Sequence, residues 1–198
     1  MTIIVAVRDS DTLTLASDTR VSSDDTVLSL HRDGPLKIGT NGDYLIGAAG
    51  RLRTGQVLMN SSIVQPHPNL SIEELTRFMI REFSPSVQSE LHAAGVEQVS
   101  DSERLLTESE VIVCAAGIPF AVGEDYSIMR GETIGDYEVT VVGSGYRLAL
   151  GAAYGALSSG FDRSSYDLAR MMCAAAVRWD PYCGGDIVSV SQKVTATS

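Results

Sequence analysis

The order of hydrophobic and polar positions predicts β-strands in both halves of the chain. Residues 3–7 are continuously apolar, which is typical of a strand that is buried on both faces. A polar turn follows, and residues 12–16 then alternate like the returning strand of a hairpin, which residues 17–22 continue. Apolar runs bounded by Gly, Pro, Asn or Asp predict further strands at residues 36–39, 44–50, 111–116, 120–122, 126–129, 138–142 and 186–190.

Apolar positions three and four residues apart predict helices between these strands. Ser71 and Glu74 form a capping box, which predicts the start of a helix that Pro85 kinks or restarts and that fades by Gly95. The polar residues 96–108 have no clear period and are expected to form a loop. Helical spacing predicts the other helices over residues 51–62, 146–157 and 164–178.

Two strand hairpins, two helices, a group of strands, two helices and a closing strand therefore follow one another. Hairpin connections favour antiparallel sheets, and paired helices need a sheet face to cover. The expected fold class is α+β, a four-layer αββα sandwich of two mainly antiparallel sheets flanked by helices, with residues 1–198 forming one domain. A doubly wound parallel sheet is the alternative, but it would need strands that alternate singly with helices.

Composition narrows the class of protein further. The 198 residues are 44% hydrophobic and 20% charged, and the net charge of −10 argues against a nucleic-acid or anionic-membrane partner. No apolar run reaches the length of a membrane span or has the basic leader of a signal peptide. Cys114, Cys173 and Cys183 are scattered and suggest neither a disulfide framework nor a zinc site. We therefore expect a soluble cytoplasmic protein with no metal and no cofactor.

The first two residues carry the most specific chemical possibility. If Met1 is removed, Thr2 holds a hydroxyl and a free α-amine on one residue, and an α-amine with a pKa of about 7.7–8.0 is partly neutral at physiological pH. Many proteins begin Met-Thr without using the threonine. Taken singly, Asp18 and Asp180 also fit turns, Lys37 a strand edge and Ser144 a helix N-cap.

Other catalytic schemes fit the sequence less well. His31, His67 and His92 lie far apart, and neither a GxSxG elbow nor a phosphate-binding loop is present. Asp24 and Asp25 are more typical of a solvated loop than of a metal site.

Six segments in register resemble a β-type subunit of the proteasome family, including the bacterial proteasome-like peptidase that works with an ATP-driven unfoldase ring. The resemblance covers nearly the whole chain. It rests on Met-Thr before the first strand, Ser-Asp-Thr-Arg-Val-Ser at 17–22, Leu-Lys-Ile at 36–38, Leu-Ile-Gly-Ala-Ala-Gly at 45–50, Val-Gly-Ser-Gly at 142–145 and Asp-Pro-Tyr-Cys-Gly-Gly-Asp at 180–186.

The resemblance implies a role for each matched residue. Thr2 Oγ would be the nucleophile and its own amine the base, while Lys37 would favour the deprotonated oxygen and Asp18 would hold Lys37. The Gly47 N–H would donate to the oxyanion. The residues expected to orient the amine or to bind substrate are Ser144, Asp180, Ser22, Leu45, Ala48 and Ala49. Cys183 replaces the serine of the late turn and would position the amine more weakly.

The function that this resemblance implies is an N-terminal-threonine peptidase, enclosed in a homo-oligomeric ring or stacked rings. Its substrates would be peptides or unfolded proteins, delivered by an ATP-dependent unfoldase, with cleavage after apolar side chains. Two alternatives stay open at this point. One is a non-catalytic structural ring subunit of the same fold, and the other is an amidase of the wider N-terminal-nucleophile group that acts on a small amide.

Overall fold

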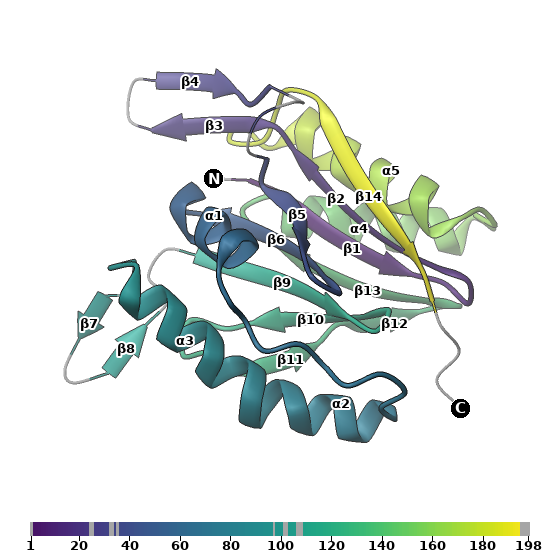
Figure 1. Ribbon diagram of the computed structural model, residues 1–198. Helices are drawn as coiled ribbons and strands as arrows, with labels where there is room; N and C mark the ends of the chain where they lie inside the picture. Colours follow the sequence, from purple (N-terminus) through teal and green to yellow (C-terminus); the bar gives the residue numbers. More distant parts are fainter. Residues whose placement is uncertain are drawn as a thin grey trace.

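Two five-stranded antiparallel sheets lie face to face at the centre of the molecule, and helices cover the outer face of each (Figure 1). The computed structural model describes residues 2–23, 26–31, 34, 36–96, 98–100, 103–105 and 109–194. The predicted α+β class and αββα layering are confirmed. Met1 and the predicted Asp24-Asp25 loop lie outside the described residues.

The first sheet has the strand order β12-β13-β1-β2-β14 and carries the N-terminus. Its strands are β1 (Ile4–Arg8), β2 (Thr12–Asp18), β12 (Glu132–Ile134), β13 (Tyr137–Val142) and β14 (Ile187–Lys193). The apolar β1 pairs with β2 through the predicted hairpin and with β13 on its other side. This central place explains why residues 3–7 are apolar without alternation: one face of β1 meets the second sheet and the other meets the helices.

The second sheet has the strand order β11-β10-β9-β6-β5. Its strands are β5 (Ile38–Asn41), β6 (Tyr44–Gly50), β9 (Ser109–Ala115), β10 (Ile118–Val122) and β11 (Ile128–Arg130). The predicted hairpin joins β5 to β6, but its two turn residues are Gly42 and Asp43, because Asn41 still pairs with Tyr44, and Gly42 has the positive φ of 58° that the first turn residue requires. The predicted strand at 36–39 begins two residues late, so Lys37 lies just before β5.

Helices form the two outer layers. The second sheet is covered by α1 (Leu52–Asn60), α2 (Ile72–Phe78), a π-helical turn (Met79–Phe83) and α3 (Ser84–Ala93), and the first sheet by α4 (Tyr146–Ser158) and α5 (Ser165–Trp179). The predicted capping box starts α2, because the Ser71 and Glu74 side chains each accept the other's backbone N–H. Pro85 lies in the first turn of α3, directly after the π-helical turn, which is where the sequence predicts a kink or restart of the helix.

Short hairpins depart from the sequence-based expectation. Residues 98–105, expected to be a loop, contain β7 (Gln98–Ser100) and β8 (Glu103–Leu105), which pair with each other. The predicted extension of β2 through residue 22 is interrupted at Thr19, and β3 (Arg20–Ser23) pairs instead with β4 (Thr26–Ser29). This second hairpin projects beside the N-terminus (Figure 1).

Candidate active site

Thr2, Asp18 and Lys37 meet at one end of the first sheet. Thr2 immediately precedes the β1 region, Asp18 ends β2, and Lys37 precedes β5 of the opposite sheet. Each is buried, with exposed fractions of 2%, 0% and 4%. The hydrophobic strands on either side therefore carry three polar side chains into the interior, where they must satisfy one another.

The Asp18 carboxylate organises this cluster. Its Oδ1 accepts hydrogen bonds from Thr2 Oγ at 3.0 Å, from the Ile3 backbone N–H at 3.1 Å and from Lys37 Nζ at 2.7 Å. Its Oδ2 accepts the Gly184 N–H at 2.9 Å. With four donors, the buried carboxylate is fully satisfied and is held in one orientation.

Lys37 Nζ also donates to Thr2 Oγ, so an ammonium group lies directly against the hydroxyl. Burial lowers the pKa of Lys37, and the Asp18 carboxylate partly offsets this by raising it. A cation at this distance stabilises negative charge on Thr2 Oγ. The geometry thus favours a reactive hydroxyl at residue 2.

A second set of polar groups approaches Thr2 from the turn after β13. Ser144 Oγ donates to the Thr2 carbonyl oxygen at 3.4 Å, and it lies 3.9 Å from Cys183 Sγ. Cys183 Sγ in turn donates to Asp180 Oδ2 at 3.6 Å. The residues expected to orient the α-amine therefore form a chain, Asp180–Cys183–Ser144, which ends on Thr2.

Cys183 takes the position between the aspartate and the serine. Burial, together with the nearby Asp18 and Asp180 carboxylates, raises the pKa of its thiol to about 12. The thiol is therefore protonated at neutral pH and acts as a weak hydrogen-bond donor rather than as a thiolate nucleophile.

Two cavities flank Thr2. The first, of about 20 Å³, is lined by Thr2 together with Arg20, Val21, Ser22, Lys37, Ala48, Gly50 and Leu52. The second, of about 280 Å³, is lined by Thr2 together with Ala49, Gly50, Ser109, Glu110, Glu124, Gly143 and Ser144. Of the residues expected to bind substrate, Ser22 and Ala48 thus line the first cavity and Ala49 the second.

Gly47 lies inside β6, as expected, but its N–H does not face Thr2. A Cβ added to Gly47 would lie 2.6 Å from Ile4 Cγ2 and 3.2 Å from Ile38 Cγ2, so this residue fills the narrow space between the two sheets. The Ala48 N–H donates to the Lys37 carbonyl. Because amides alternate in direction along a strand, the Gly47 N–H faces β9, away from Lys37. The expected role of Gly47 as oxyanion donor does not fit this position.

Gly50 occupies the place expected of Gly47. It lines both cavities beside Thr2, and it lies two residues after Ala48, so its N–H points toward the same edge of β6 as the N–H that reaches Lys37. Its φ of 90° suits glycine at the last residue of the strand. In the sequence, Gly50 is marked by its place at the end of the small-residue run at 47–50.

Leu45 also departs from expectation. It is 4% exposed and belongs to the core between the sheets, with Ile4 and Ala6 among its neighbours. Leu45 lines neither cavity next to Thr2. Side chains alternate along β6, so residues 45, 47 and 49 face the first sheet and Ala48 faces the helices. The wall of the small cavity is supplied by Ala48 and Leu52 instead.

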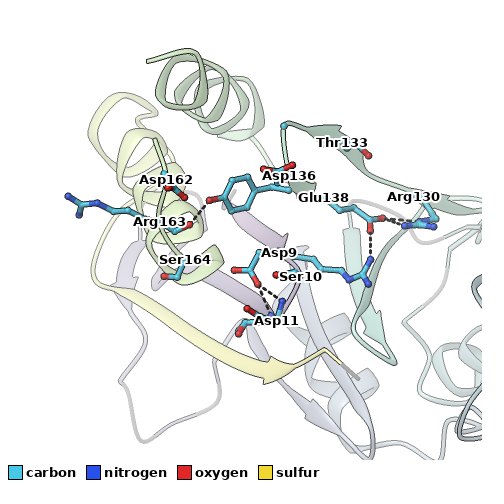
Figure 2. A pocket seen from close by; sticks show the side chains of 14 residues that line it. Asp9, Ser10, Asp11, Arg130, Thr133, Asp136, Glu138, Asp162, Arg163 and Ser164 are labelled. Carbon is cyan, nitrogen blue, oxygen red and sulfur yellow. Dashed lines mark hydrogen bonds and ion pairs between the residues drawn. The ribbon is translucent and has the colours of Figure 1, made fainter. Parts of the chain in front are cut away.

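A further hollow lies at the other end of β1. It has a volume of about 950 Å³ and is formed by the β1–β2 turn, the β12–β13 hairpin and the segment between α4 and α5 (Figure 2). At its wall, Glu138 accepts hydrogen bonds from both Arg8 and Arg130.

Among the described residues no group of His, Cys, Asp and Glu side chains is arranged to hold a metal ion. In the same part of the chain, no helix is long and apolar enough to cross a membrane.

Comparison with solved structures identifies the fold. BPH from Thiobacillus denitrificans, solved in complex with epoxomicin, superposes with a TM-score of 0.76 at 18% identity, covering 98% of this chain and 100% of that one. This is a proteasome β-type fold. Eukaryotic HslV from Trypanosoma brucei gives a TM-score of 0.62 at 21% identity, covering 96% of this chain and 99% of that one.

The same fold occurs in Anbu from Pseudomonas aeruginosa, solved as a helical assembly. Its TM-score is 0.58 at 15% identity, with 96% of this chain and 81% of that one covered. No family model matches the sequence, and no curated protein matches it either. The fold expected from the sequence resemblance is therefore confirmed, because BPH, HslV and Anbu share it.

Proposed function

We propose that this protein is an N-terminal-threonine peptidase, with Thr2 as the nucleophile after removal of Met1. The observation that carries the proposal is the Asp18 carboxylate, which holds Thr2 Oγ and Lys37 Nζ together in the interior. A buried cation against a hydroxyl is costly, and it is suited to stabilising an alkoxide.

The reaction proceeds in two steps. The neutral α-amine of Thr2 takes the Oγ proton, and Oγ attacks the carbonyl carbon of the scissile peptide bond. The Gly50 N–H stabilises the oxyanion that forms, a contribution worth about 10²–10³ in rate for one donor. The amine then passes its proton to the leaving nitrogen, the C–N bond breaks, and an ester with Thr2 Oγ remains. Water, activated by the same amine, hydrolyses the ester and restores Thr2.

Each of the two cavities next to Thr2 receives one half of the substrate. Ser22 and Ala48 lie at the cavity on the Lys37 side, which suits the acyl half, and its apolar part favours small apolar side chains before the cleaved bond. Ser144, which approaches the Thr2 backbone, lies at the other cavity, where the leaving half would receive its proton.

We further propose that the subunits form a closed homo-oligomeric ring in the cytoplasm, with an ATP-driven unfoldase delivering unfolded chains. The helical assembly of Anbu, a protein of the same fold, supports self-association. The three described cysteines are free and buried, which is compatible with a reducing compartment.

Covalent labelling tests the proposal directly. Intact mass spectrometry first establishes that Met1 is absent, and the processed protein is then treated with a peptide epoxyketone. We expect one adduct on wild type, none on Thr2→Ala, and an adduct on Thr2→Ser, which keeps both the hydroxyl and the amine. Processed wild-type protein without a Thr2-dependent adduct would exclude the peptidase and favour a non-catalytic subunit. A Thr2-dependent adduct with turnover of small amides but not peptides would favour the amidase.

A further inference from the structure

Glu110 connects the two sheets at the end of the molecule that holds Thr2. It is the second residue of β9 and lies opposite Ala49, next to Gly50 of β6. Its Oε2 accepts a hydrogen bond from the Gly143 N–H at 2.8 Å. Gly143 follows β13 of the other sheet, so this one carboxylate ties the first sheet to the second (Figure 1).

Gly143 lies directly against the backbone of Thr2. A Cβ at this residue would be 2.2 Å from the Thr2 carbonyl oxygen, and the φ of 99° is one that side chains rarely adopt. The following residue, Ser144, donates to that same oxygen. The position of the Thr2 backbone therefore depends on the position of the Gly143-Ser144 turn that contacts it.

The proposed reaction needs groups from both sheets in register. Thr2 leads into the first sheet, while Gly50 ends a strand of the second. A useful oxyanion donor must come within 2.7–3.1 Å of the developing charge, and a displacement of about 1 Å can cost about 10²-fold in rate. Packing between the sheets brings their strands together, and the directional Glu110–Gly143 bond adds a fixed contact at the end that holds Thr2.

We propose that Glu110 is a positioning residue for the Thr2 reaction, acting through Gly143 to align Thr2 with the Gly50 N–H. This inference rests on the proposed function. Glu110 is exposed at the wall of the cavity of about 280 Å³ and belongs to none of the apolar cores. Apolar packing therefore does not explain why Glu110 lies here. Its hydrogen bond with the Gly143 N–H does, since a charge-assisted hydrogen bond is about twice as strong as a neutral one.

Glu82 provides the control. It has the same side chain and is also exposed, but it lies on the π-helical turn and lines neither cavity next to Thr2. The variants are Glu110→Ala, Glu110→Gln, which keeps an oxygen acceptor without the charge, and Glu82→Ala. If Glu110→Ala does not fold, Glu110→Met takes its place, since it keeps the side-chain stem and lacks the acceptor.

Steady-state hydrolysis of a fluorogenic peptide and hydrogen exchange at Gly143 are the two readouts. We expect Glu110→Ala to lower kcat by about 10–100-fold with KM within about twofold, Glu110→Gln to recover most of kcat, and Glu82→Ala to keep wild-type kcat. Exchange at Gly143 should accelerate in Glu110→Ala alone.

Three results would overturn the inference: unchanged kcat in Glu110→Ala, an equal loss in Glu82→Ala, or a Glu110→Gln variant as impaired as Glu110→Ala. Failure of the proposed function looks different, because the processed wild type would then show no Thr2-dependent turnover at all. Faster exchange at Gly143 without loss of kcat would show that the bond exists but does not serve the reaction.

Discussion

Replacing Asp18 by asparagine removes the negative charge from the buried cluster while keeping the size of the side chain. Lys37 would then be left as a buried cation, 4% exposed and without its carboxylate partner. Removing one member of a buried pair typically costs about 3–5 kcal/mol of stability. The variant can limit this cost by releasing the Lys37 proton on folding.

The free energy of releasing this proton is an upper limit on the stability lost in Asp18→Asn, and this limit depends on pH. With an ordinary pKa of 10.5 for Lys37 and 1.36 kcal/mol per unit, deprotonation costs about 5 kcal/mol at pH 7 and about 2 kcal/mol at pH 9. Burial already lowers the pKa of Lys37, and losing Asp18 removes the largest opposing influence. Because the pKa of Lys37 is lower in the folded variant than in the unfolded one, the unfolded variant binds more protons, so the stability of Asp18→Asn should rise with pH relative to wild type.

Urea unfolding at a fixed protein concentration, repeated at pH 7, 8 and 9, measures this difference. Asp18→Asn combined with Lys37→Met removes both charges, so the double variant should be much less destabilised than the sum of the single variants. A penalty below about 1 kcal/mol for Asp18→Asn, or the same penalty at pH 7 and pH 9, would refute the buried ion pair described for this site.

Three other perturbations test separate parts of the structure. Gly143→Ala should lower the free energy of unfolding in urea by at least about 2 kcal/mol, because its Cβ would lie 2.2 Å from the Thr2 carbonyl oxygen. Gly151→Ala is the control in α4, where the added Cβ meets open space, and it should raise the free energy of unfolding by about 0.5–1 kcal/mol. Ser71→Ala should lower stability by about 1 kcal/mol through the lost cap of α2. Because the pKa of Cys183 is raised from 9.0 to about 12, stability should fall from pH 9 upward as the unfolded chain loses its thiol proton, and Cys183→Ser should flatten that fall in a pH series.

Local signals in the sequence predicted most of the secondary structure. The apolar β1 strand, the β5–β6 hairpin and the Ser71 capping box each depend on neighbouring residues, and each lies where it was expected. The hairpin of β7 and β8 was missed because its residues are polar and short of β-branched side chains, so no period distinguishes them from a loop.

Only part of the candidate site could be predicted from the sequence. Segment order and a family resemblance brought Thr2, Asp18 and Lys37 into consideration, and the structure places all three in contact. From the sequence resemblance Gly47 was expected to be the oxyanion donor, whereas we propose Gly50, a second glycine of the same strand. Which amide faces Thr2 depends on the alternation of β6 and its pairing with Lys37, and that register comes from the neighbouring strands.

The sequence by itself determined the strands and helices, the acidic character of the chain and the presence of a threonine that an amine could activate. These properties follow from composition and from spacing along the chain. The tertiary structure alone decided that Glu110 reaches Gly143 and that Gly50 borders Thr2. The reason is physical: these contacts join strands of two different sheets, so they form only when apolar packing between the sheets brings distant segments into register.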